Sequence, residues 1–157
     1  MNHIKSNSSS YLIGSMMLLV VGAAIFLLIS QLRPTTMLFL GNGVFDARIA
    51  STQAAREQGL SGVTSLKSSE ALIFVFPSDD MWDMWMKDMR VPLDIIWLDK
   101  DKKVVYSVKN IAADNTTVFT PNVPARYVIE VPAGTIDGQK IKSGRAAVFD
   151  IDKVEVN

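Results

Sequence analysis

The chain has 157 residues, with 16 basic and 16 acidic side chains, one histidine and no cysteine. About 120 residues remain beyond an apolar amino-terminal segment, which is the size of one domain. The balanced charge argues against nucleic acid as a partner, because binding to phosphate needs clustered Lys and Arg. The lack of cysteine excludes disulfides, thiolate nucleophiles and Cys-based zinc sites.

The single histidine, His3, precedes the apolar segment, so the domain cannot assemble a histidine-dependent triad or a histidine-bearing metal centre. Asp79, Asp80, Asp83 and Asp88 lie close in sequence but lack the regular spacing and the glycine of an EF-hand loop. We interpret them as a solvated acidic turn. We therefore expect no metal and no cofactor.

Residues 11–32 form an apolar run that is interrupted only by Ser, Gly and Gln. At about 1.5 Å per residue, a helix of this length spans roughly 30 Å, the thickness of the hydrocarbon core. The run predicts a single transmembrane anchor behind a short polar amino terminus at residues 1–10. A cleaved signal peptide is the alternative, but cleavage at the small residues 22–24 would cut the apolar run in half.

Residues 33–43 are interpreted as a connector that contains a first strand and ends in a Gly-Asn-Gly turn. A second strand over Val44–Ala50 would complete a hairpin. A short helix is then expected over Gln53–Gln58, with Ser51 or Thr52 as its N-cap and a glycine at its end.

Four further strands are expected from short runs rich in β-branched and aromatic residues: Ala71–Phe76, Leu93–Leu98, Val104–Val108 and Arg126–Val131. Pro77 should end the first of them, and the tail over Arg145–Val156 should hold one or two more. These elements predict an α+β domain over residues 44–156. It would be β-rich, with a mostly antiparallel sheet or partly closed barrel and one or two short helices, preceded by the transmembrane helix.

Asp94 is an acidic residue inside the apolar run Val91–Trp97. A buried carboxylate must be paired or hydrogen-bonded, because desolvating it alone costs roughly several kcal/mol. Lys87 and Arg126 are the candidate partners. Alternatively, strand alternation turns Asp94 to solvent, or it forms a purely structural ion pair.

The segment Met81–Met89 is the densest in Trp and Met, and these side chains belong most simply to a core. Strand alternation would nevertheless put Trp85 beside charged residues. We therefore predict a ligand-binding groove near Trp85, Lys87, Asp94 and Arg126.

Five motifs occur in order along the domain: Phe74–Pro77, Trp85–Lys87, Pro92–Asp99, Pro124–Gly134 and Ile141–Gly144. Together they resemble the DUF192 family of small uncharacterised bacterial and archaeal proteins, which are often exported or membrane-anchored. The resemblance covers residues 44–156. It implies a β-rich α+β fold without an established activity or cofactor. The short polar amino terminus before the apolar run and the long domain after it resemble a signal anchor, so we expect a single-pass protein of a bacterial or archaeal membrane whose domain lies outside the cytoplasm.

The chain departs from the pattern of that family at Asp88, where an asparagine is usual, and at Val108, where a histidine is common. These departures favour binding over catalysis. We expect a non-catalytic module of the cell envelope that binds a small molecule, a glycan or a protein partner. The alternatives are an enzyme with Asp94 as its base and Lys87 as electrostatic partner, or a structural or assembly factor of the envelope.

Overall fold

The computed structural model describes residues 14, 16–17, 20–21, 34–152 and 154–157. The chain divides into two units, Met1–Arg33 and Pro34–Asn157. Most of the predicted anchor at residues 11–32 lies outside the described residues. Among those that are described, no helix is long and apolar enough to cross a bilayer.

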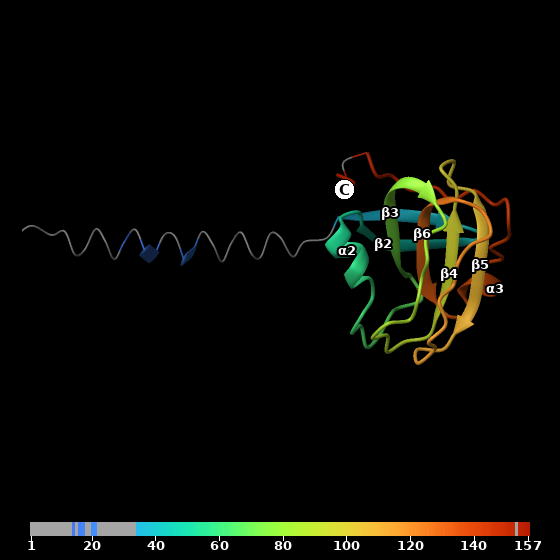
Figure 1. Ribbon diagram of the computed structural model, residues 1–157, viewed down its shortest axis with the longest axis horizontal. Helices are drawn as coiled ribbons and strands as arrows, with labels where there is room; N and C mark the ends of the chain where they lie inside the picture. Colours follow the sequence, from blue (N-terminus) through green and yellow to red (C-terminus); the bar gives the residue numbers. More distant parts are fainter. Residues whose placement is uncertain (1–13, 15, 18–19, 22–33, 153) are drawn as a thin grey trace, which may run out of the picture. The chain divides into compact units, whose positions relative to one another are not determined.

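Six strands form one open, mixed sheet in the described part of the second unit, in the order β1-β2-β3-β6-β4-β5 (Figure 1). The strands are β1 (Thr35–Leu40), β2 (Gly43–Ala50), β3 (Glu70–Asp80), β4 (Leu93–Leu98), β5 (Val104–Ile111) and β6 (Ala125–Pro132). Among these strands only β2 and β3 pair in parallel; every other neighbouring pair is antiparallel. The sheet is therefore mostly antiparallel, and it is not closed into a barrel.

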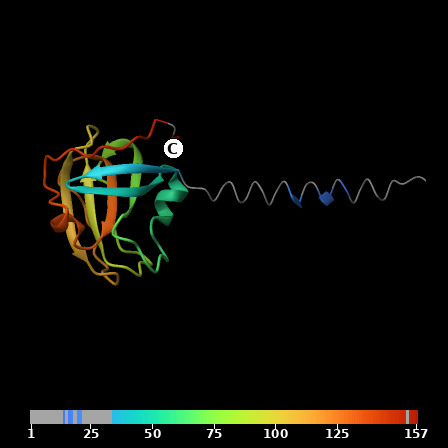
Figure 2. The ribbon, with the colours of Figure 1, turned by 180° about the vertical axis from the view of Figure 1, so that it is seen from behind.

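The carboxy-terminal segment, residues 145–157, lies along both edges of this sheet and forms one isolated β-bridge at each edge. Phe39 in β1 and Val148 exchange backbone hydrogen bonds of 2.9 Å in each direction. Lys103, directly before β5, is bridged to Ala146. The segment passes beside the β1–β2 hairpin in the rear view (Figure 2). It forms no strand over its described residues, so the additional strands predicted for the tail are wrong.

The short helix α2 (Gln53–Gln58) confirms the predicted helix. Oγ1 of its N-cap Thr52 accepts a hydrogen bond from the Ala55 amide at 3.2 Å, and the helix ends at Gly59. A second helix, α3 (Thr135–Gly138), fits the predicted number of one or two short helices, but its position was not predicted. Helix α2 lies in the connection between β2 and β3, and α3 follows β6.

Strand β3 continues past Pro77 to Asp80, so the prediction that this proline ends the strand is wrong. The register with β6 explains the difference. Val75 pairs with Tyr127 and Asp80 with Ala125, and the ladder is irregular between these two pairs. Proline has no amide hydrogen to donate, and it is tolerated where the ladder is already interrupted.

Neighbouring residues of a strand point to opposite faces, so the sheet carries two separate apolar cores. Leu72, Phe74 and Phe76 of β3 belong to one core, against which Ala55 of α2 packs. The residues between them, such as Ile73, belong to the other core, which includes Ile136 of α3. We call these two sides of the sheet the α2 face and the α3 face. The inner strands β3 and β4 bury apolar side chains on both faces, which explains their continuous apolar runs.

Candidate functional site

Asp94 is fully buried on the α3 face and accepts hydrogen bonds from three backbone amides. Its Oδ1 lies 2.7 Å from the amide nitrogen of Asn110 and 3.2 Å from that of Gly134. Its Oδ2 accepts from the amide of Ile136 at 2.7 Å. The carboxylate therefore ties the end of β5 and the start of α3 to β4, which is a structural role.

The four residues predicted as one groove lie in three separate places. Nε of Arg126 donates to Oδ1 of Asp79 at 2.6 Å, and this pair is separate from Asp94. Only Trp85 and Lys87 line a common cavity. Among the described residues neither Lys87 nor Arg126 pairs with Asp94, so the prediction of a charged partner for this carboxylate is wrong. Its partners are backbone amides, which no sequence pattern had indicated.

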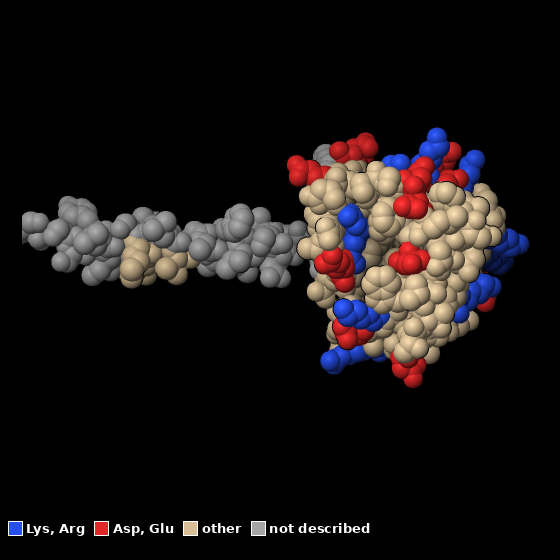
Figure 3. Space-filling view, in the orientation of Figure 1, with Lys and Arg blue, Asp and Glu red and all other residues tan. Residues whose placement is uncertain are grey.

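A cavity of about 540 Å³ lies on the α2 face, between α2, the segment 80–89 and the strands β3 and β6. The parallel pairing of β2 and β3 requires a connection that crosses the sheet, and α2 is part of that connection. Aromatic and methionine side chains contribute much of the lining: Phe74, Phe76, Met81, Trp82, Met84, Trp85 and Met89. Charged side chains of both signs lie near α2 on an otherwise largely uncharged face (Figure 3).

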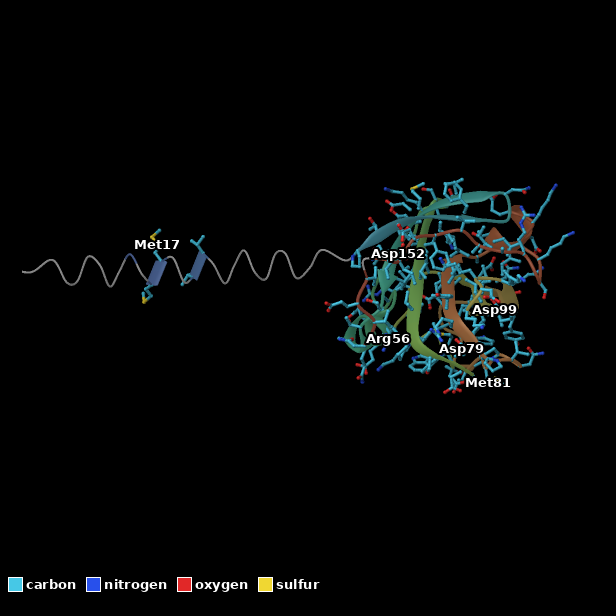
Figure 4. All side chains as sticks on the ribbon, turned by 90° about the horizontal axis from the view of Figure 1, so that it is seen from above. Met17, Arg56, Asp79, Met81, Asp99 and Asp152 are labelled. Carbon is cyan, nitrogen blue, oxygen red and sulfur yellow. The ribbon has the colours of Figure 1, made fainter. Side chains whose placement is uncertain are left out.

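The aromatic wall of this cavity is held in place by stacking and hydrogen bonds. The rings of Phe76 and Trp82 stack with centroids 4.1 Å apart, and the guanidinium of Arg56 lies 5.4 Å from the Phe76 centroid. The indole nitrogen of Trp97 donates to the carbonyl oxygen of Trp82 at 2.8 Å. Arg56, Asp79 and Met81 lie toward the same side of the unit in Figure 4. These contacts fix the position of the wall.

Glu130 is the buried polar residue of this cavity. It lies in β6 opposite Leu72 of β3 and Ile95 of β4, both of which belong to the α2-face core. Its side chain is 3% exposed, and its Oε2 has no hydrogen-bond partner among the described residues. Burial raises the pKa of Glu130 to about 8, against a smaller lowering by the charge of Arg48. At neutral pH the carboxyl is therefore mostly protonated, so it both donates and accepts hydrogen bonds.

Glu130 was not predicted as a site residue, although the sequence pattern that points to Asp94 applies equally to it. Both are acidic residues inside an apolar strand-forming run, and Glu130 lies within Arg126–Val131. Arg56 was assigned only to the short helix, because its stacking on Phe76 depends on how α2 packs on the sheet.

The DUF192 family, described as an uncharacterized ACR, matches residues 37–149 of this chain. The chain belongs to this family. Two relatives named UPF0127 protein are similar to it: one from Thermococcus gammatolerans is 34% identical over 105 residues, and one from Thermococcus kodakarensis is 32% identical over 99 residues. These alignments cover 66% and 62% of this chain and 65% and 60% of the relatives. The chain therefore spans less than two thirds of the length of either relative.

Two solved structures share the DUF192 fold described above. A protein of unknown function from Novosphingobium aromaticivorans has a TM-score of 0.68 and 27% identity, over 74% of this chain and 84% of that one. A putative transcription regulator from Sinorhizobium meliloti has a TM-score of 0.69 and 22% identity, over 75% and 94%. The second similarity shows the fold alone. The family match confirms the predicted family, and the two structures are similar to its β-rich fold.

The α2-face cavity places one protonated carboxyl group among aromatic and methionine side chains, with charged side chains of both signs elsewhere in its lining. Over the residues that the structure describes, no three His, Cys, Asp or Glu side chains are grouped to hold a metal ion. A buried carboxyl with a raised pKa is a common feature of functional sites. In this cavity it offers one donor and one acceptor to a bound molecule.

Proposed function

We propose that this DUF192 domain is a small-molecule-binding module whose site is the cavity on the α2 face, with Glu130 as its central polar residue. The observation that carries the proposal is the buried Oε2 of Glu130, which lacks a hydrogen-bond partner in a cavity large enough for a ligand. An unsatisfied buried polar atom costs about 1–3 kcal/mol. A bound molecule with a complementary polar group removes that cost.

The dimensions of the cavity favour a small molecule over a protein or a glycan. Its volume of about 540 Å³ lies within the usual range of small-ligand sites. A stable protein interface needs roughly 800 Å² of surface on each partner, which a cavity of this size does not supply by itself. The prevalence of aromatic and methionine side chains in its wall favours a ligand with an apolar body.

The positions of the acidic residues favour binding over the enzyme alternative. Asp94, the base of that alternative, lies on the α3 face with both oxygens bonded to backbone amides. Lys87 lines the cavity on the other face. A general base has to reach its substrate within hydrogen-bond distance, and Asp94 is on the wrong side of the sheet to do so.

A screen of aromatic fragments by ¹H-¹⁵N NMR tests the proposal. We expect fragments with one ring and one polar group to shift the indole resonance of Trp82 and the amides of residues 80–89. Glu130→Leu removes both the donor and the acceptor, so it should weaken the binding of these fragments by about tenfold, since one lost hydrogen bond in a buried site is worth about 1.4 kcal/mol.

The matched control is Glu155→Leu, the same change at an exposed glutamate that does not line the cavity. It should leave every fragment affinity unchanged. Fragments that shift only resonances outside the cavity, or no fragment at all, would contradict the proposed function.

We further propose that residues 11–32 tether this module to a membrane and that the cavity lies outside the cytoplasm. The proposal is supported by the length and apolar composition of that run in the sequence. The full chain should stay with membranes after alkaline carbonate extraction, and a variant that lacks residues 1–33 should be released. Release of the full chain by carbonate would contradict the tether.

A further inference from the structure

We infer that the ligand of the α2-face cavity is an organic cation, a small ammonium compound with an apolar body whose charged head pairs with the carboxylate of Glu130. The inference rests on the proposed function and names the chemical class of its ligand. Its starting point is geometric, because Oε2 of Glu130 is buried, has no partner among the described residues and belongs to the cavity wall.

The charges around the cavity favour a cation over an anion. Four acidic residues and two basic residues line it: Glu57, Asp80, Asp83, Glu130, Arg56 and Lys87. One of the two basic residues is already engaged. The guanidinium of Arg56 donates to the carbonyl oxygens of Ser51, Val75 and Asn157, at 3.0 Å for Val75 and 2.6 Å for Asn157. These hydrogen bonds leave the positive charge of Arg56 in place, so the lining carries a formal charge of 2 − 3 = −1 with Glu130 protonated and 2 − 4 = −2 with Glu130 ionised. The lining is therefore net acidic in both states.

The aromatic wall is also suited to a cation. The face of an aromatic ring attracts positive charge, and Phe76 already holds the guanidinium of Arg56 at 5.4 Å from its centroid. Trp85 lines the same cavity and is 50% exposed, so part of its surface is accessible to a ligand. An ammonium ion with an apolar body would thus find a carboxylate for its head and aromatic and methionine side chains for its body.

Binding of such a cation is coupled to release of a proton. Without ligand, Glu130 is mostly protonated at neutral pH; an ammonium head favours the ionised form, so the proton leaves to solvent as the ion pair forms. The neighbours of Glu130 on β3 and β4 are apolar, and Arg48 on β2 is the charge that acts on it from within the sheet. The charged groups that share the cavity come from α2 and the segment 80–89: Arg56, Glu57, Asp80, Asp83 and Lys87.

Three probes with one ring and different charges test the inference: benzylammonium, benzyl alcohol and benzoate. Their affinities are measured by calorimetry on the full chain in lipid nanodiscs, and their position by the indole resonance of Trp82. We expect benzylammonium to bind at least tenfold more tightly than the alcohol, and benzoate more weakly than either. The benzylammonium affinity should rise about tenfold from pH 6 to pH 7, with a proton released on binding.

In Glu130→Gln the preference for benzylammonium and its pH dependence should both disappear, while Glu155→Gln should retain them. Equal or tighter binding of the alcohol or of benzoate in the cavity would overturn the cation inference and leave the proposed function standing. A benzylammonium affinity independent of pH would also overturn it. If none of the three probes shifts Trp82, the cation inference fails, and the fragment screen then decides the proposed function separately.

Discussion

Asp94→Ala is expected to lower the free energy of unfolding by about 3–6 kcal/mol, the largest loss among the single substitutions considered. Three backbone amides lose their acceptor at once: the hydrogen bond from Ile136 is buried, those from Asn110 and Gly134 are partly buried, and an unsatisfied buried group costs about 1–3 kcal/mol. Asp94 is fully buried, so solvent cannot readily take the place of the carboxylate. Urea unfolding of the full chain, followed by tryptophan fluorescence, measures the change.

The local backbone explains why this carboxylate matters. Leu93 pairs with Ile111 and Ile95 with Val108, so β5 has a bulge opposite Asp94. Asn110, within the bulge, has φ +52°, and Gly134 at the start of α3 has φ +87°. These left-handed conformations turn their amides toward Asp94.

The hydrogen exchange of the amides that Asp94 accepts from should therefore accelerate in Asp94→Ala. Asp94→Asn should lose less stability than Asp94→Ala, because one acceptor oxygen remains. The matched control is Asp101→Ala, at an exposed turn position whose side chain makes no described hydrogen bond. A loss for Asp94→Ala no larger than that of Asp101→Ala would contradict the structural role.

Glu130→Gln is expected to gain stability relative to the wild type as the pH rises. Between pH 4 and pH 8, the difference in the free energy of unfolding between the two proteins should shift in favour of the variant by on the order of 5 kcal/mol. Burial raises the pKa of Glu130 from 4.5 to about 8, and each unit corresponds to about 1.4 kcal/mol. The folded protein thus holds a proton that the unfolded chain releases above pH 4.5. The wild type therefore loses stability as the pH rises from about 4.5 to about 8.

Glutamine has the size of glutamic acid and never ionises, so this pH dependence should be missing from the variant. Urea unfolding at several pH values measures both proteins, and Glu155→Gln serves as the control with wild-type behaviour. A difference between wild type and Glu130→Gln that stays constant from pH 4 to pH 8 would show that Glu130 is not buried as described.

Local patterns predicted much of this fold because their causes are local. The Gly-Asn-Gly turn predicted the β1–β2 hairpin, and Thr52 followed by an alanine-rich segment and Gly59 predicted α2. The sheet order was not predictable in this way, because β6 inserts between β3 and β4, and that pairing joins segments far apart in sequence. The continuation of β3 past Pro77 likewise depends on its partner strand.

The candidate site was only partly predictable for a related reason. Asp94 and Glu130 give the same sequence signal, an acidic residue within an apolar strand. Asp94 lies beside Val131 of β6 and faces α3, where backbone amides satisfy it, whereas Glu130 faces the opposite side, where its Oε2 has no described partner. Trp85 and Lys87 both line the α2-face cavity, and their closeness in sequence is the reason that a local pattern pointed to them together.

The most direct test of the central claim is a ¹³C NMR titration of the Glu130 side-chain carboxyl in the folded full chain. The claim requires a buried, unpaired carboxyl in the α2-face cavity, so the titration midpoint should lie near pH 8. The midpoint should fall when a cationic ligand occupies the cavity. A midpoint near the ordinary glutamate value of about 4.3 would mean that the carboxyl is solvated or already paired, and it would contradict the binding site proposed around Glu130.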